Sequence, residues 1–327
     1  TELLMVNTET FEDGVLRKGR QTNWRVNRNG RSFNTHFHWT EQNNDFDVPL
    51  GILGRNYTPD AQGLHGFVEY RFWPEDSWLD RIGPRVFFAN QEDGTGLRIY
   101  EELSPQLQMT WSGDSSFNVG TNSIKERLRP QDFAGLTTTR DYEQQRYFVG
   151  FSTDTLQTIG FSAEVDEGTV INFVPPIGEE PELADRLFIE AELLWRPIDR
   201  LRVDTSVLST ELEDRGGRGT IFTDRIVRTR WNYQFTKEMS LRVILQHEDT
   251  KPTPGLSRLT RDENLNLDVL FRYVLNPWSA LYVGFNNNES NLQLVENEQG
   301  QTELVRTEEL ARDGQQLFVK FSYLFQP

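Results

Sequence analysis

Apolar side chains recur at every second position in the last stretch of the chain. Between positions 315 and 327, five large apolar residues lie two apart: Leu317, Val319, Phe321, Tyr323 and Phe325. Successive side chains of a β-strand point to opposite faces, so these five share one face. The pattern is typical of the closing strand of a bacterial outer-membrane β-barrel, and it also fits a half-buried strand of a soluble sheet.

The same alternation organises the chain from position 146 onward. It predicts strands at 147–151, 159–165, 187–195, 201–207, 227–235, 241–245, 265–273 and 281–285. The connections alternate between short turns, such as 197–199 and 236–238, and long polar stretches, such as 210–224 and 286–313. Outer-membrane barrels sort short turns to one rim and long loops to the other. The Greek-key links of a soluble sandwich would break this order.

The first half alternates less regularly. Strands are expected at 4–11, 21–27, 33–41 and 64–72, with a hairpin around Asn29-Gly30, a strong turn dipeptide. Shorter strands are expected at 85–90, 97–101, 107–111 and 117–121. Residues 46–62 read as irregular and 125–142 as a loop. Taken together, the pattern predicts an all-β fold: an antiparallel up-and-down transmembrane barrel of roughly 14–16 strands. Residues 1–327 are expected to form one barrel domain, either whole or as the C-terminal portion of a longer protein.

Aromatic residues gather beside the short turns. The set predicted for one membrane interface is Trp195, Phe235, Tyr273, Trp278 and Phe325. Aromatic rings favour this position because they meet apolar and wet neighbours at once. Aromatics capping a soluble core are the alternative, but they would not sort to one rim.

The opposite face of the predicted strands is polar and mixed in sign. The residues expected to line the lumen are Glu190, Glu192, Asp204, Arg228, Arg230, Arg242, Asp268, Arg272 and Lys320. Both a wide water-filled pore and a narrow barrel crossed by ion pairs would accommodate them. The excess acid lies mainly in the predicted long loops, such as 164–185 and 296–313.

Composition removes several classes of function. A formal net charge of −16 argues against contact with nucleic-acid phosphates. The absence of Cys excludes thiol catalysis and disulfides. No apolar run is long enough for a transmembrane helix. The chain begins at Thr1 without a charged-then-apolar signal segment, so we expect a processed chain or a piece of a longer one.

Candidate chemistry is sparse. No nucleophile-elbow, zinc-protease, phosphate-loop or EF-hand motif occurs, and no cofactor or metal is predicted. His36 and His38 share a strand face and are interpreted as polar lumen or surface residues, the alternative being a metal chelate. His247 stands beside Glu248 and Asp249 at a predicted outer rim. It is the one catalytic candidate, because a base oriented by a carboxylate has this arrangement.

The second half resembles a bacterial family of unknown function. The landmarks are KERLRPQDF at 125–133, the segment 230–245, NLDVLFRYVLNPWSALYVGF at 266–285 and QLFVKFSYLFQ at 316–326, and 46–71 is similar to the family's middle part. In that family a domain similar to family 9 carbohydrate-binding modules precedes a long C-terminal β-region. The present chain shows no such N-terminal domain. The resemblance implies an outer-membrane barrel and a link to sugars, and it transfers no catalytic residue.

Three functions follow as hypotheses. The first is a bacterial outer-membrane channel or surface-binding protein for a polar solute, with carbohydrate suggested by the resemblance. Its expected partners are outer-membrane lipid, the solute or glycan, and the barrel-assembly machinery, which would engage the C-terminal strand. The second is a barrel hydrolase with a rim site at His247. The third is a soluble β-sandwich binding module.

Overall fold

The computed structural model describes residues 1–12, 14–43, 45–46, 61–133, 135–276, 278–296 and 302–323. Within them the chain forms strands β1 (Glu2–Glu12), β2 (Val15–Asn29), β3 (Phe33–Gln42), β4 (Ala61–Tyr70), β5 (Leu79–Asp93), β6 (Arg98–Trp111), β7 (Ser115–Leu128), β8 (Arg140–Thr153), β9 (Ile159–Asn172), β10 (Glu182–Ile198), β11 (Leu201–Asp214), β12 (Gly219–Gln234), β13 (Met239–Pro252), β14 (Asp262–Asn276), β15 (Ser279–Glu296) and β16 (Thr302–Tyr323). No helix suited to crossing a membrane occurs among these residues.

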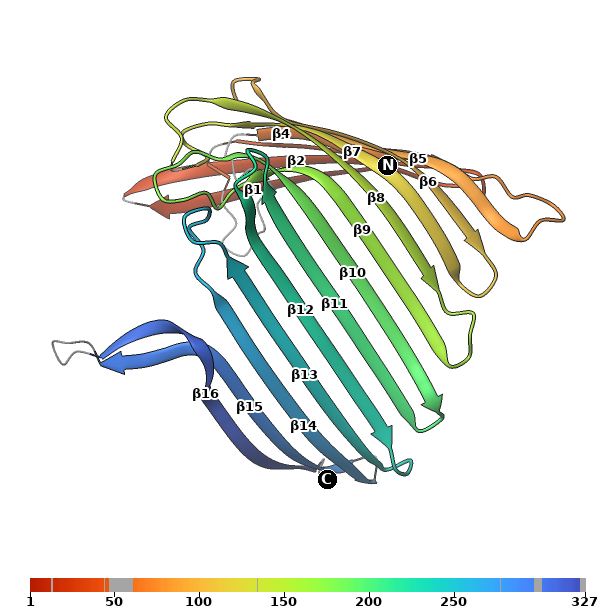
Figure 1. Ribbon diagram of the computed structural model, residues 1–327. Helices are drawn as coiled ribbons and strands as arrows, with labels where there is room; N and C mark the ends of the chain where they lie inside the picture. The colour runs from red at the N-terminus through yellow and green to blue at the C-terminus, as the bar shows by residue number, and fades with distance from the viewer. Residues whose placement is uncertain are drawn as a thin grey trace.

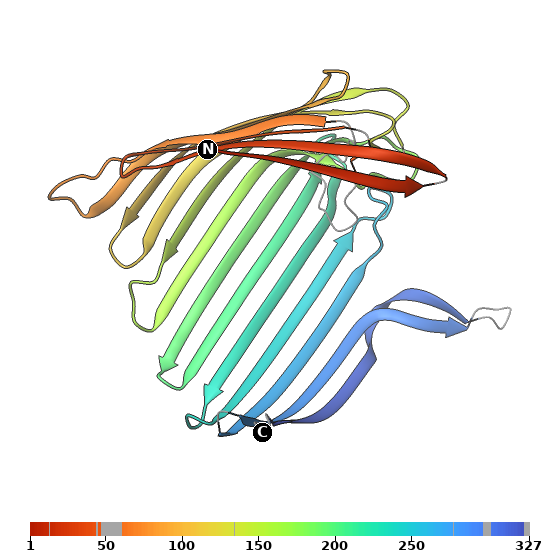
Figure 2. The ribbon, with the colours of Figure 1, turned by 180° about the vertical axis from the view of Figure 1, so that it is seen from behind.

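The strands make one 16-stranded sheet in strict chain order, and every neighbouring pair is antiparallel. The sheet curves into a trough with β1 and β16 at its two edges (Figures 1 and 2). In the described residues these two strands are not paired with each other. The up-and-down order of an outer-membrane barrel is therefore confirmed, at the upper end of the predicted strand number. A Greek-key sandwich is wrong for this chain.

The register divides the sheet into an apolar face and a polar face. It aligns one apolar row across β10 to β16: Trp195, Val203, Trp231, Val243, Val269, Phe285 and Leu317. The adjacent row points to the other side and is mostly polar: Leu194, Asp204, Arg230, Ile244, Asp268, Asn286 and Gln316. The apolar face is open, with exposed fractions of 43% for Trp195 and 72% for Leu317. An exposed apolar band of this kind is what a lipid-facing barrel surface presents.

The two rims differ in phase and in loop length as predicted, with connections such as 129–139 and 173–181 at one end and turns such as 199–200 at the other. The turns at 199–200 and 235–238, and Trp278 between β14 and β15, lie at the same end of the sheet as the end of β16. At the other end the strands extend far into segments expected to be loops. The segment 210–224 is strand except for 215–218, and residues 286–296 and 302–313 belong to the paired strands β15 and β16.

The predicted acidic loops are therefore partly strand, as in β9 and β10. Beyond the membrane a strand keeps its backbone hydrogen bonds, but its side chains no longer need to alternate between lipid and water. The periodicity therefore disappears while the ladder continues. The hairpin of β15 and β16 also bends outward (Figure 1), and its register shifts twice, between Asn288 and Glu289 and between Ser290 and Leu292. Such irregularities bend a strand.

Candidate functional site

All nine residues predicted to line the lumen lie on the polar face. The register places them on one side of β10 to β14 and β16: Glu190, Glu192, Asp204, Arg228, Arg230, Arg242, Asp268, Arg272 and Lys320. The structure thus brings these side chains to a common surface. That this surface encloses a lumen stays a prediction.

Four of the five predicted interface aromatics lie at the turn rim. Trp195 and Tyr273 close the apolar face near the ends of β10 and β14, and Phe235 and Trp278 lie in the adjoining turns. Trp278 is 52% exposed, and its backbone N–H donates to Asn276 Oδ1 over 2.9 Å. Phe325 lies outside the described residues.

A small hollow marks the middle of the polar face. It has a volume of about 300 Å³ and is lined by Glu192, Leu193, Leu194, Asp204, Thr205, Ser206, Arg228 and Arg230. Asp204 accepts hydrogen bonds from Arg202 Nη2 over 2.8 Å and from Arg230 Nη2 over 3.1 Å. One carboxylate therefore orients two guanidinium groups, while Arg228 in the next row also reaches the hollow. The arrangement can bind a small polar or anionic group.

Three connections at the loop rim are tied together, and we call them the loop cap: 129–139, 173–181 and 253–261. Arg258 Nη2 donates to the carbonyl of Phe173 over 2.8 Å, and its guanidinium lies 5.5 Å from the ring centre of Phe133. Ser257 Oγ donates to the carbonyl of Val174 over 3.0 Å. Segments distant in the sequence thus hold one another over the end of the sheet.

An ion-pair group also fixes the loop cap to the sheet. Arg129, only 5% exposed, pairs with Asp132 at 2.7 Å and with Asp93 at 2.6 Å. Its hydrogen bonds to Asp132 raise the pKa of the guanidinium, which therefore stays charged despite its burial. Nearby, Glu180 accepts from Thr137 Oγ1 over 3.0 Å and also pairs with Arg140. These bonds, chiefly those from Thr137, lower the pKa of the Glu180 carboxyl.

A larger pocket of about 550 Å³ lies between the loop cap and the polar face. Asp166 bridges two of the strands beside it, at 3.2 Å from Arg146 Nη1 and 2.6 Å from Arg186 Nη2. The wall combines aromatic, amide and charged groups: Tyr100, Glu126, Gln144, Arg146, Asn172, Phe173, Arg186 and Phe222. Flat apolar rings beside a few placed polar groups are typical of a small-molecule site.

None of these pocket residues was predicted from the sequence. Phe173 and Asn172 fell inside a stretch interpreted as a loop, and Arg146 and Arg186 sit at the edges of expected strands. The only available signal was weak. Arg146, Asp166 and Arg186 lie on three consecutive strands, but their contacts can be recognised only when the strand register is known.

The structure places His247 differently from the prediction. His247 lies on β13, on the same side of the sheet as the apolar face, while Glu248 points to the polar face. Its Nε2 lies 3.1 Å from Glu263 Oε1 on β14, and Asp249 is the third member of the group. The carboxylate that orients this imidazole therefore comes from the neighbouring strand, which the sequence alone did not indicate.

Comparison with known protein families found no match, and comparison with curated protein sequences found none. Among solved structures, the chain is similar to the siderophore receptor PirA from Acinetobacter baumannii, with a TM-score of 0.51 and 8% identity over 98% of this chain and 59% of that one. It also matches OmpT, an outer-membrane protein of Vibrio cholerae, at a TM-score of 0.36 and 11% identity, over 98% of this chain and 95% of that one.

These likenesses concern the fold alone. The PirA comparison, the stronger of the two, supports the sheet order and curvature of an outer-membrane β-barrel. The chain spans little more than half of PirA's length. The predicted location in the bacterial outer membrane agrees with this fold.

Proposed function

We propose that this chain forms an outer-membrane β-barrel whose polar face lines a water-filled path for a polar solute. One observation carries the proposal: a single sheet exposes an apolar face and, on its other side, a continuous ionic and amide surface. Neither face is covered by another layer of the described residues. Lipid on one side and water on the other would satisfy both.

We further propose a carbohydrate as the solute or surface ligand. The resemblance to a family with a carbohydrate-binding-like domain suggests it, and the pocket beneath the loop cap supports it. Tyr100, Phe173 and Phe222 supply flat apolar surfaces there, and Gln144 and Asn172 supply amide donors and acceptors. A neutral, hydroxyl-rich ring matches both kinds of group.

The partners follow from the same proposal. Outer-membrane lipid would cover the apolar face. The barrel-assembly machinery would engage β16, which has five apolar or aromatic residues at its end and an unpaired edge in the described residues. Exposed strand edges pair readily with other strands, so β16 is the part of the sheet suited to that contact.

The test is solute entry into liposomes that contain the full-length chain. Swelling rates would be measured for neutral sugars of increasing size, with heat-shifted migration on SDS gels confirming that the chain is folded. We expect mono- and disaccharides to enter the vesicles. In a Phe173→Ala variant we expect the order of entry rates among the sugars to change. Folded protein in sealed vesicles that admits no sugar and binds none would contradict the proposal.

A rim hydrolase is the second candidate, and the His247–Glu263 contact favours it. An imidazole held by a carboxylate can act as a general base, and Arg261 Nη2 holds the same carboxylate at 2.7 Å. The measurement is hydrolysis of lipid, glycan and peptide panels. This candidate predicts activity that His247→Ala abolishes and His65→Ala retains. Absence of hydrolysis by folded wild-type protein would remove it.

A further inference from the structure

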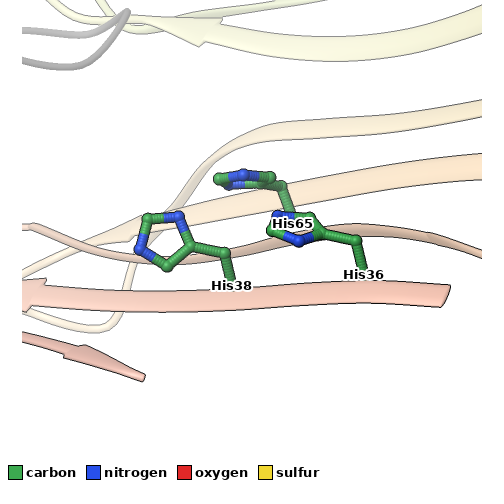
Figure 3. A group of neighbouring side chains, drawn as sticks. All are labelled: His36, His38 and His65. Atoms are coloured by element: carbon green, nitrogen blue, oxygen red, sulfur yellow. The ribbon is translucent and has the colours of Figure 1, made fainter. Parts of the chain in front are cut away.

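Three of the chain's four histidines meet at one place on the sheet. His36 and His38 lie two residues apart on β3, and His65 on β4 is the direct partner of His38. Figure 3 shows the three imidazole groups gathered from these neighbouring strands. The ring centres are 4.9 Å apart for His38 and His65, 5.6 Å for His36 and His65, and 6.2 Å for His36 and His38.

We propose that His36, His38 and His65 form a binding site for a divalent transition-metal ion of the Zn²⁺ or Cu²⁺ type. One nitrogen from each ring lies within 4.8 Å of the others. A tetrahedral zinc site with bonds of about 2.0–2.1 Å separates its ligand atoms by roughly 3.4 Å. Small rotations about the side-chain torsions close that difference.

Neighbouring polar groups already orient two of the rings. His36 Nδ1 lies 2.5 Å from Asn27 Oδ1, so Nδ1 carries the proton and Nε2 is free to bind metal. His38 Nε2 lies 3.1 Å from Asn23 Oδ1 and 3.2 Å from Thr40 Oγ1, which leaves Nδ1 as its ligand atom. Metal-binding histidines are commonly fixed through the second ring nitrogen in this way.

The site faces the water side of the sheet. The register followed from β10 back to β3 puts all three histidines on the polar face. His36 and His38 are half-buried and His65 is exposed, so an ion could reach them. Arg25 lies opposite His38 in the register and pairs with Glu2 at 3.7 Å.

The donor set selects the metal class. Three neutral imidazoles suit zinc, copper and nickel, whereas calcium and magnesium require oxygen ligands. Three protein ligands also leave a fourth position for water or a further ligand. The second possible cluster, His247 with Asp249 and Glu263, supplies one imidazole and two carboxylates. Both of its carboxylates already have cationic partners: Glu263 pairs with Arg261 at 2.7 Å and Asp249 with Lys251 at 2.5 Å.

The experiment is calorimetric titration of the detergent-solubilised full-length chain with Zn²⁺ alone. We expect one tight site per chain. Loss of a supporting partner costs about 10–100-fold in metal affinity, so His65→Gln should weaken binding by at least about 100-fold and Asn27→Ala by about tenfold. His247→Gln is the matched control and should bind as the wild type does.

Each contrary result is decisive. No Zn²⁺ binding by the wild type, or unchanged binding by folded His65→Gln, would overturn the proposal, and so would loss confined to His247→Gln. If the histidine variants fail to fold, electron paramagnetic resonance of Cu²⁺ on the wild type replaces them. We expect hyperfine coupling to several nitrogens, and coupling to none would refute the site. Neither result depends on whether sugars pass the barrel.

Discussion

Asp204 and Arg230 lie directly opposite each other on β11 and β12, with Asp204 Oδ2 3.1 Å from Arg230 Nη2. The pair sits in the middle of the polar face, and Arg202 completes the contact at 2.8 Å from Asp204 Oδ1. If the polar face lines a passage, this group lies where a moving ion would meet it. The charges there should therefore set ion selectivity.

Arg230→Gln is predicted to shift selectivity toward cations. One charge a few ångströms from an ion in water is worth about 1 kcal/mol, which corresponds to about a fivefold change in the cation-to-anion permeability ratio. Reversal potentials in planar bilayers measure this ratio. Arg225→Gln, on the same strand but the opposite face, is the control and should leave the ratio unchanged. Equal shifts in both variants would show that the polar face is not the path.

Gly284 and Phe318 predict a specific weakness in the β15–β16 pair. They are register partners, and a Cβ added at Gly284 would clash with the ring of Phe318. Because the Phe318 ring is 40% exposed and can turn aside, Gly284→Ala should destabilise the fold by about 1 kcal/mol, the low end of the cost of overpacking. Urea denaturation in detergent gives the value. Gly314→Ala, whose added Cβ would have no atom closer than 3.7 Å, should be nearly neutral.

A second substitution tests the cause. Adding Phe318→Ala to Gly284→Ala should recover part of the loss, because the ring no longer occupies the space of the new methyl group. If the losses in the free energy of unfolding of the two single variants simply added in the double variant, the contact between these two residues would not explain the effect.

Removal of Arg129 should loosen the loop cap. Arg129→Met leaves Asp93 and Asp132 without their buried partner, and breaking a buried ion pair typically costs about 3–5 kcal/mol. Faster proteolysis within 129–139 and a lower urea midpoint are the expected results. Arg127→Met is the control. Its partner Asp141 is 62% exposed, and such pairs contribute about 0–1 kcal/mol. Similar losses for both variants would contradict the buried-anchor interpretation.

The Glu180 contact predicts an acid-sensitive cap. The hydrogen bonds from Thr137, together with Arg140, lower the folded-state pKa of Glu180. Its stabilising contribution is therefore full above the ordinary glutamate pKa and is lost as the pH falls through the lowered value. The protection factors for hydrogen exchange at 135–140, which correct for the intrinsic pH dependence of exchange, should fall below about pH 4.

Glu180→Gln provides the comparison for this effect. The variant should exchange faster already at neutral pH and lose most of the acid dependence. Glu182→Gln, which contacts Arg218 at 3.8 Å instead of Thr137, should behave like the wild type. Acid dependence that survives in Glu180→Gln would assign the effect to another group.

The sequence predicted those strands in which apolar and polar side chains alternate because one face of the strand is apolar and the other polar. From β8 to β16 the alternation of apolar and polar residues located the strands and assigned all nine polar-face residues to one side. It failed where lipid no longer imposes alternation. The outer ends of β11, β12, β15 and β16 looked like loops because polar residues outnumber the apolar ones there, although Leu212 and Ile221 are buried in a small cluster.

Contacts between distant residues could not be predicted at all. His36 and His38 were recognised as sharing a strand face, but only the register brings His65 beside them. The partner of His247 was sought next to it in the sequence, although Glu263 on the adjacent strand supplies it. Pairing across strands depends on register, and a single sequence does not specify the register between two strands such as β3 and β4.

The most direct test uses the absence of native cysteine. Glu192 and Leu193 are neighbours on β10 that point to the polar and apolar faces. Each would be replaced by Cys in turn, labelled with a fluorophore and placed in lipid vesicles. The account predicts that brominated lipid quenches the label at position 193 and that a water-soluble quencher reaches the label at position 192. Equal access of the aqueous quencher to both labels would contradict a lipid-facing barrel wall.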